Sequence, residues 1–532
     1  MRRLLVLAAL AGACAQETGA ADRISLRVYG VSFDNVEQDP YQGVEYVRIQ
    51  VTDGPASLQD EFFTFDEALP RLVSNIEFGE GLQLTVEGWS KNTATNSLGQ
   101  VLSRGRSVKF DMAEDGDKIA LTVPLARLNT FSYTTQAGTA ESKATSLGRG
   151  RMGHTATLLP DGKVLIVGGL DFKEGHKGDY TNANQVRALY KDAEVFDPAS
   201  GAFAPVGNLT APRAFHAAAA LPDGKVLISG GLSAQGTSVA VSKTFEVYDP
   251  LTGAFTELSG IALGEARAGH TATLLDEFGN VLIAGGFALG ASGEVASLTT
   301  GEVLCTPTYS CTSNGSAGII FTDTMGESRA FHSAEKVGVG ANGETDAVVL
   351  IGGEGADVVR DTVETFRLRQ PAGFQKATLP KMTSGPRTRH SATYVSRQQF
   401  IHVVGGFSDK AHAATVVAID SYQVQQQAFQ TAQPFFSVEG RGGHGAVLLD
   451  RSTVLVFGGW GDAGIPLSSA EVIFEKKGND SKTYIDRGTV GAMRAARGGA
   501  LGVFTENGTA VILGGVGATG TAVTSGEFYT PL

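Results

Sequence analysis

The chain has 532 residues and a formal net charge of −12, and 42% of its residues are hydrophobic. This length predicts several domains, or one large repeat domain with a smaller one, and the apolar content excludes a wholly disordered chain. Glycine is abundant, with 69 residues, and charged residues make up only 18%; this balance favours all-β structure with tight turns, and without a Lys/Arg-rich run nucleic acid is not expected as a partner.

Residues 1–13 form a predicted signal peptide. Two arginines, a short apolar stretch and small residues precede Cys14, and the stretch is too short to span a bilayer. Small residues before a cysteine resemble a bacterial lipobox, which implies a lipid on Cys14 and an outer-membrane lipoprotein. The same residues also fit cleavage after Ala15, so a periplasmic or secreted protein is the alternative. We expect contact with a membrane only through the lipid anchor.

Residues 14–21 are predicted to be a short linker, and residues 22–128 a β-sandwich domain. Several segments here alternate apolar and polar residues, which is typical of strands with one wet face. About seven short strands in this length suggest an immunoglobulin-like sandwich. The segment has no cysteine pair, so the prediction concerns architecture alone.

The N-terminal domain carries an acidic stretch. Residues 34–80 contain 11 acidic and two basic side chains, and Asp34, Glu37 and Asp39 lie close together in it. Such oxygen ligands can hold a structural calcium ion outside the cytoplasm. A solvated acidic face is the favoured interpretation of this composition, with the calcium site as the alternative, and we expect no other cofactor and no other metal site.

Residues 129–147 separate this domain from a repetitive region at 148–532. The last unit of that region stops before it can form an outer strand. Residues 129–133 are predicted to supply this closing strand, and the polar residues after them to form a strap.

The repetitive region is defined first by a Gly-Gly pair after an apolar run, at intervals of 53–67 residues. A repeat of this period is typical of propellers and related arrays. The pairs are Gly168-Gly169, Gly230-Gly231, Gly285-Gly286, Gly352-Gly353, Gly405-Gly406, Gly458-Gly459 and Gly514-Gly515.

An Arg-x-x-His motif precedes each of the first six pairs. The copies are Arg151/His154, Arg213/His216, Arg267/His270, Arg329/His332, Arg387/His390 and Arg441/His444. In the seventh unit we align the segment RAAR with this motif, which puts Arg497 at the histidine position. Because these residues recur in every unit, we expect them to be structural and to tie neighbouring turns by hydrogen bonds.

An acidic residue heading a β-run follows each Gly-Gly pair, so every unit offers four short strands. These residues are Glu194, Glu246, Glu302, Glu364, Asp420, Glu471 and Glu527. Asp-Gly turns between apolar runs in the first two units are typical of tight hairpins.

The three signals together resemble the kelch repeat family over residues 148–532. The resemblance implies an all-β fold, a seven-bladed kelch-type β-propeller preceded by the Ig-like β-sandwich. The family's tryptophan in the outer strand is replaced here by Phe or Tyr, which supplies similar apolar packing.

Cysteines and off-register histidines are the remaining candidates for chemistry. Cys305 and Cys311 are expected to pair as a disulfide in an oxidising compartment, or else to be buried thiols. His402 lies in an apolar run and is expected to be a satisfied core residue, whereas His176 lies in a polar insertion.

No catalytic motif stands out, and we predict no catalytic residue. In kelch adaptor proteins the loop entering the inner strand faces the ligand, which makes the variable residues inside Arg-x-x-His the first binding candidates. Phe215 and Phe331 can stack on a sugar or peptide, and Arg389 and Arg497 can form a basic mouth.

The sequence therefore predicts an envelope-anchored binding or scaffold protein whose partner is an envelope protein or a surface polysaccharide. The alternative is a carbohydrate-active enzyme of the sugar mutarotase kind acting in the propeller funnel. Two convergent titratable groups with shifted pKa values would favour the enzyme.

Overall fold

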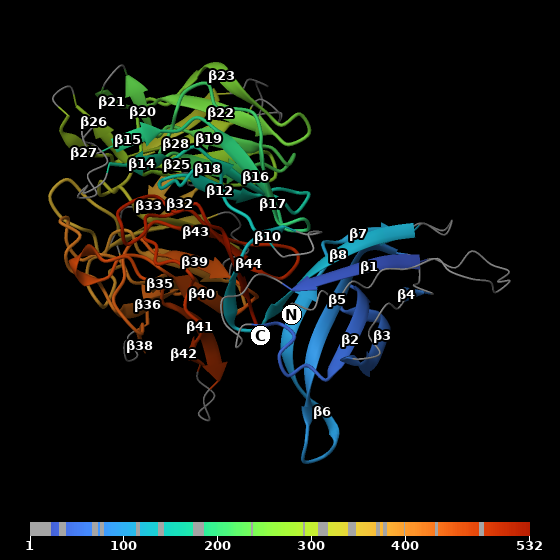
Figure 1. Cartoon of the computed structure of the whole chain (residues 1–532). Coiled ribbons are helices and arrows are strands. Elements are labelled where there is room, and N and C mark those ends of the chain that lie inside the picture. The colour runs from blue at the N-terminus through green and yellow to red at the C-terminus, as the bar shows by residue number, and fades with distance from the viewer. Residues whose placement is uncertain are drawn as a thin grey trace.

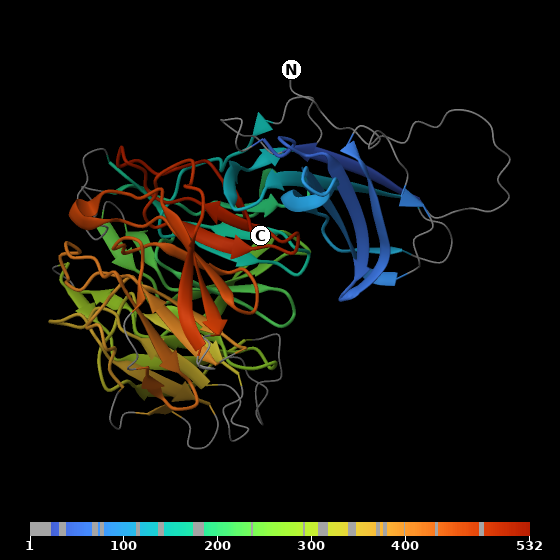
Figure 2. The ribbon, with the colours of Figure 1, turned by 90° about the horizontal axis from the view of Figure 1, so that it is seen from below.

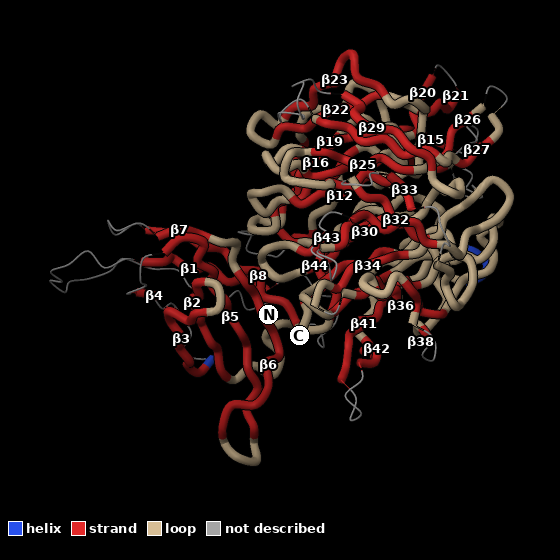
Figure 3. The backbone as a smooth tube through the Cα atoms, turned by 180° about the vertical axis from the view of Figure 1, so that it is seen from behind, coloured by secondary structure: helices blue, strands red, loops and turns tan. Residues whose placement is uncertain are grey.

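The computed structural model describes residues 23–30, 39–65, 73–74, 79–112, 118–136, 143–173, 186–235, 238–290, 293–306, 318–338, 347–368, 373–375, 380–397, 399–430, 435–477 and 483–532. Regular structure in these ranges is almost entirely β-strand (Figure 3), with a short 3-10 turn at Asp462–Gly464. No helix within them is long and apolar enough to cross a membrane.

The N-terminal domain is a sheet with the strand order β3-β2-β5-β6-β8-β1-β4, and β7 pairs with β5. The strands are β1 (Arg23–Gly30), β2 (Tyr46–Asp53), β3 (Ala56–Thr64), β4 (Val73–Ser74), β5 (Gly79–Asn92), β6 (Ser97–Arg106), β7 (Phe110–Met112) and β8 (Lys118–Arg127). Residues of β2 and β5 share one core with residues of β1 and β8, including Val47, Leu84, Leu26 and Val123. The described strands pair along one connected path, with β1 parallel to β8, so the Ig-like arrangement stays a prediction.

In the part of the chain that the structure describes, seven larger sheets of four or five strands follow one another, besides several two-stranded sheets. The first six larger sheets take their strands in sequence order, whereas the seventh adds β9 beside β45. The first four are β12 (Thr155–Leu158), β13 (Val164–Val167), β16 (Ala193–Asp197), β17 (Ala202–Pro205); β18 (Ala217–Ala220), β19 (Val226–Ser229), β22 (Thr244–Asp249), β23 (Ala254–Ala262); β24 (Thr271–Leu274), β25 (Asn280–Ala284), β28 (Thr300–Cys305), β29 (Gly318–Thr324); and β30 (Ser333–Val337), β31 (Ala347–Ile351), β32 (Val363–Arg367), β33 (Gly373–Gln375). The last three are β34 (Ser391–Val395), β35 (Phe400–Val404), β36 (Ala418–Gln423), β37 (Ala428–Phe429) with β38 (Phe435–Phe436); β39 (Gly445–Leu448), β40 (Thr453–Phe457), β41 (Ala470–Lys477), β42 (Thr483–Thr489); and β43 (Leu501–Phe504), β44 (Ala510–Leu513), β45 (Glu527–Thr530) with β9 (Thr130–Tyr133).

The first strand of each sheet contacts the first strand of the next, and β43 contacts β12, so the series returns to its start. The second glycine of each Gly-Gly pair donates a backbone hydrogen bond to the motif arginine carbonyl of the following unit, as Gly286 N does to Arg329 O at 2.9 Å. Gly515 N donates in the same way to Arg151 O at 2.9 Å. The first and seventh units are therefore joined by the same bond that joins the others.

The first glycine of each pair allows this close approach. Gly285 has φ +60°, and a Cβ there would lie 2.3 Å from the Arg329 carbonyl oxygen and 2.9 Å from Cε1 of His332. A larger residue would clash with the neighbouring unit in a conformation that L-residues rarely adopt.

The seventh sheet is completed by a strand from the other end of the repetitive region. β9 pairs antiparallel with β45, with Phe131 opposite Tyr529, at the position where the sequence analysis placed residues 129–133. The strands β10 (Thr135–Gln136) and β11 (Lys143–Ala144) form a small ribbon after it.

The N-terminal sheet lies beside the seventh unit, as Figures 1 and 2 show from two directions. The Gln83 side chain donates a hydrogen bond to the Glu506 carbonyl at 2.7 Å, and Arg106 lies against Gly508. Together with the direct connection from β8 to β9, these contacts hold the domain against the ring of sheets.

Candidate functional site

The motif arginines lie in the interior of their units. Arg213 is 1% exposed; its Nε and Nη2 bond Glu246 Oε1 at 3.0 and 2.9 Å, and its Nη1 bonds the Gly230 carbonyl at 2.7 Å. The second Glu246 oxygen accepts the Thr210 N–H at 2.8 Å. The other units contain equivalent ion pairs: Arg151–Glu194, Arg267–Glu302, Arg329–Glu364, Arg387–Asp420, Arg441–Glu471 and Arg497–Glu527. Each arginine precedes the first strand of its sheet, and its acidic partner lies in the third strand. The ion pair therefore ties these two parts of the unit together.

The predicted role of Arg497 is therefore wrong, and so is the alignment that suggested it. Arg497 is fully buried and bonds Glu527 at 2.5 Å, and its carbonyl accepts the Gly459 N–H as the other motif arginines do. It stands at the arginine position of the motif, and Ala500 at the histidine position. Arg497 consequently cannot form a basic mouth with Arg389.

The motif histidines lie between neighbouring units and are neutral. His216 Nε2 is hydrogen-bonded to Thr155 Oγ1 of the preceding unit at 2.9 Å. Burial, with the nearby arginine charge, lowers the pKa of His154, His216 and His390 to about 3, and burial likewise lowers the pKa of His270, His332 and His444 well below the usual range.

The third residue of each motif belongs to a second series of backbone hydrogen bonds, which links neighbouring units from the first to the seventh. Phe215 N donates to Gly153 O at 2.7 Å, and the series continues through the later units to Gly499 N and Gly443 O at 2.8 Å. All members have positive φ between 50° and 70°: Gly153, Phe215, Gly269, Phe331, Arg389, Gly443 and Gly499. Four members are glycines, the residue suited to this backbone, but three carry large side chains despite the strain.

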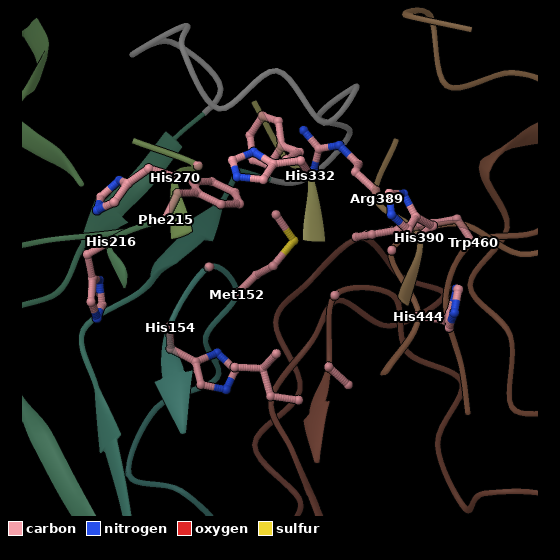
Figure 4. A pocket seen from close by; sticks show the side chains of 17 residues that line it. Met152, His154, Phe215, His216, His270, His332, Arg389, His390, His444 and Trp460 are labelled. Carbon is pink, nitrogen blue, oxygen red and sulfur yellow. The ribbon is translucent and has the colours of Figure 1, made fainter. Parts of the chain in front are cut away.

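These three side chains meet at a cavity of about 280 Å³ (Figure 4), which we call the mouth cavity. The Phe215 and Phe331 rings are 5.7 Å apart and nearly perpendicular, and Arg389 Cζ lies 3.9 Å from the Phe331 ring centroid. The cavity is also lined by Met152, Trp460, Leu501 and the six motif histidines. Three of the four binding candidates therefore lie together, and Arg497 does not join them.

The Arg389 side chain contacts Glu354 and His412. Glu354 Oε1 lies 2.9 Å from His412 Nε2 and 3.6 Å from Arg389 Nε, and it accepts the Thr388 hydroxyl at 3.2 Å. Burial alone raises the pKa of the Glu354 carboxyl, but the His412 hydrogen bond and the Arg389 charge outweigh it, so the pKa is lowered. The arrangement fixes the guanidinium over the Phe331 ring.

Sequence reasoning missed Trp460, Glu354 and His412. Trp460 and Glu354 each directly follow a Gly-Gly pair, at a position that is apolar in the other units. Val516, for example, lies in the apolar cluster beneath the cavity with Leu232 and Phe287. A comparison of this one position across the units would have identified Glu354, because the other units have an apolar residue there.

The other sequence candidates lie away from the mouth cavity or outside the described residues. Cys305 is buried and disulfide-bonded, while Cys14, Cys311 and His176 lie outside the described residues. His402 is buried, with Nδ1 3.0 Å from Ser421 Oγ and Nε2 3.3 Å from Glu475.

The calcium site stays a prediction, because two of its three residues, Asp34 and Glu37, lie outside the described residues. Within the described ranges no group of three or more His, Cys, Asp or Glu side chains is placed to hold a metal ion.

Glu335 on β30 is a carboxyl whose pKa burial raises to about 8. Since this exceeds the ordinary value of 4.5, the stability linked to its proton is complete below about pH 4.5 and is lost as the pH rises through about 8. We expect Glu335→Gln to match the wild type near pH 4.5 and to be more stable near pH 9, by on the order of 2 kcal/mol, because the side chain keeps some solvent contact. Urea unfolding at both pH values tests this, and equal stabilities near pH 9 would contradict it.

Comparison with known proteins adds one sequence match. Residues 213–262 match the Kelch motif, and no curated protein matches the sequence. A solved structure titled "Structure of YjhT" is similar over 64% of this chain and 99% of its own, with 13% identity and a TM-score of 0.45. The motif match begins at Arg213 and includes Gly230, Gly231 and Glu246, so the second unit of the repeat matches the Kelch motif. The all-β architecture agrees with a kelch-type β-propeller.

Proposed function

We propose that the protein is an exported binding protein of the cell envelope, anchored through a lipid on Cys14. The repetitive region is a seven-bladed kelch β-propeller, and the N-terminal domain, an Ig-like sandwich, acts as its stalk. The mouth cavity takes a segment of a larger envelope ligand, a protein or a surface polysaccharide. Kelch repeats suit this role, because a rigid ring presents variable loops on one face.

The observation that carries the proposal is that three units have a large side chain at the third position of the Arg-x-x-His motif. Phe215, Phe331 and Arg389 occupy left-handed backbone where the other four units have glycine. Each side chain costs about 1–2 kcal/mol there. All three line the mouth cavity, and strain retained at a cavity points to a role in binding rather than in folding.

The titratable groups at the mouth favour binding over acid–base catalysis. The histidines that line the cavity are neutral, and Arg389 is held by its neighbours. Glu335 has a raised pKa but is not among the lining residues. A mutarotase-like enzyme needs an acid and a base that converge on the substrate.

We expect the triple variant Phe215→Gly/Phe331→Gly/Arg389→Gly to fold and to lose its ligand. Relief of backbone strain offsets part of the lost aromatic packing, and glycine already serves in the other four units. The measurement is cross-linking capture from native envelopes, with protein and glycan read by mass spectrometry. Capture should fall about tenfold or more, as for loss of binding anchors.

The matched control is Gln427→Gly, which relieves positive φ at an exposed turn away from the cavity. It should capture as the wild type does. Equal capture by the triple variant would reject the mouth cavity as the binding site.

A further inference from the structure

A group of three ionisable side chains lies beside the mouth cavity, where the fourth and fifth units meet. Glu354 follows the fourth Gly-Gly pair, Arg389 belongs to the fifth motif, and His412 comes from the loop after the fifth Gly-Gly pair. Their atoms form a triangle: Arg389 Nε lies 3.3 Å from His412 Nε2 and 3.6 Å from Glu354 Oε1, and the last two atoms are 2.9 Å apart. We call these three residues the mouth cluster.

The mouth cluster sets the charge at the cavity. Arg389 is the charged member among the described residues that line it, and the motif histidines there are neutral. Burial raises the pKa of the Glu354 carboxyl, but the His412 hydrogen bond and the Arg389 charge outweigh it, so the pKa is lowered and the carboxyl is ionised. With a neutral His412, the charges of Glu354 and Arg389 therefore cancel.

Both partners of Glu354 meet the same carboxylate oxygen. An ionised carboxylate beside a ring nitrogen favours the proton on that nitrogen, so His412 Nε2 donates to Glu354 and cannot also accept from Arg389. Glu354 Oε1 is thus shared between the imidazole at 2.9 Å and the guanidinium at 3.6 Å. Since one carboxylate balances one cation, the charge of the mouth cluster depends on whether His412 is protonated.

The loop that carries His412 is fixed, yet the imidazole meets solvent. Lys410 Nζ donates to the Ala356 carbonyl of the fourth unit at 2.5 Å, and Thr415 Oγ1 donates to Asp462 of the sixth unit at 2.7 Å. His412 itself holds left-handed backbone with φ +54°, a conformation that costs energy for a side chain of this size. Its side chain is 29% exposed, so protons can reach it from water.

The other charged side chains around this loop do not change their charge near neutral pH. They are Asp409, Lys410, Asp462 and Arg360. These two acids and two bases balance formally, and side chains of these types ordinarily stay charged between about pH 6.5 and about pH 8. Histidine is the side chain type that ordinarily gains a proton in this range. Among the described groups at this place, His412 is therefore the one expected to titrate.

We propose that His412 makes the charge of the mouth cavity depend on pH, an inference that rests on the proposed function and concerns the regulation of the same site. When protonated, His412 competes with Arg389 for Glu354 Oε1 and has the shorter contact. The mouth cluster then carries one net positive charge in place of none. Because Arg389 lines the cavity, an anionic group of the ligand is bound more tightly as the pH falls.

Iodide quenching of Trp460 fluorescence measures this charge without the natural ligand. Trp460 lines the mouth cavity with Arg389 (Figure 4), and Trp89 is the other tryptophan of the chain. Trp89→Phe leaves Trp460 as the single reporter. Iodide is an anion and acrylamide is neutral, so the ratio of their quenching constants at fixed ionic strength reports the local charge, while access to the ring cancels.

This ratio should rise by about 1.5-fold in Trp89→Phe between about pH 8 and about pH 6.5, where the protein stays folded. It should stay level in Trp89→Phe/His412→Gln. Glutamine keeps a donor for Glu354 without a charge, and Gln399 and Gln427 already adopt left-handed backbone in this chain. A level ratio in Trp89→Phe, or an equal rise in both variants, would overturn the role of His412.

Cross-linking capture from native envelopes at the same two pH values tests the effect on binding. The partner that the triple glycine variant loses should be captured about threefold more strongly at the lower pH by the wild type, and equally at both by His412→Gln. Equal capture by the wild type at both pH values overturns the regulation and leaves the proposed function standing. If no captured partner is lost in the triple glycine variant, the proposed function fails and the regulation of binding fails with it.

Discussion

Lowering the pH from 6.5 to about 5.5 is expected to reduce the free energy of unfolding by roughly 6 kcal/mol, about 1 kcal/mol for each motif histidine. The cause is burial, which holds the pKa of His154, His216 and His390 near 3 and lowers the pKa of His270, His332 and His444 well below the ordinary value. The unfolded chain binds protons below the ordinary pKa of 6.5, whereas the folded chain does not. Stability is therefore complete above pH 6.5 and is lost as the pH falls toward 3.

Urea unfolding at intervals of pH between about 7 and 5.5 measures this loss, and its slope gives the number of protons taken up on unfolding. His154→Phe should lower that number by one, since it removes one of the six buried imidazoles. A stability that stays level over this range would mean that the histidines can be protonated in the folded protein, and the neutral lining of the mouth cavity would then be wrong.

Much of the scaffold could be predicted from the sequence because each unit repeats the same local constraints. A Gly-Gly pair is needed where the next unit's arginine carbonyl approaches, as at Gly285, and a buried arginine needs an acidic partner, as Arg213 has in Glu246. Asp420 substitutes for glutamate in the fifth unit and still bonds Arg387. Constraints that recur are visible without any structure.

The alignment failed where two arginines stand three residues apart. RAAR matches the spacing of Arg-x-x-His, but the backbone requires a left-handed residue two positions after the arginine. Gly499, with φ +70°, meets this requirement only if Arg497 is the motif arginine. The position of the left-handed residue, rather than the charged residue alone, sets the register.

The contacts at the mouth could not be predicted, because they join separate loops. Glu354, Arg389 and His412 come from three places in the chain and meet only when the fourth and fifth units are adjacent. The candidate site is formed by positions where one unit departs from the repeat. Which side chains such a residue contacts depends on which units are neighbours.

Removing one carboxylate from the scaffold is expected to be the most damaging single change. Glu246→Ala leaves the Arg213 guanidinium buried without its charged partner and leaves the Thr210 N–H without its acceptor. Breaking a buried ion pair in this way costs about 3–5 kcal/mol. Glu246→Gln keeps one acceptor oxygen for Arg213 but places an NH2 donor near the Thr210 N–H. It should therefore cost less than Glu246→Ala but should not match the wild type, and urea unfolding of the two variants measures the difference.

The double variant Arg213→Met/Glu246→Leu shows how much of the loss comes from the unpaired charge. Replacing both partners by apolar residues often restores stability, but here Arg213 also bonds the carbonyls of Gly230 and Thr244. The Gly230 carbonyl would lose this donor, whereas the Thr244 carbonyl would keep the Gly230 N–H. We therefore expect the double variant to recover only part of the loss in Glu246→Ala. Full recovery would mean that the arginine acts only as a counter-ion, whereas no recovery would mean that its bonds to these carbonyls, which hold the strands of the unit together, dominate its contribution.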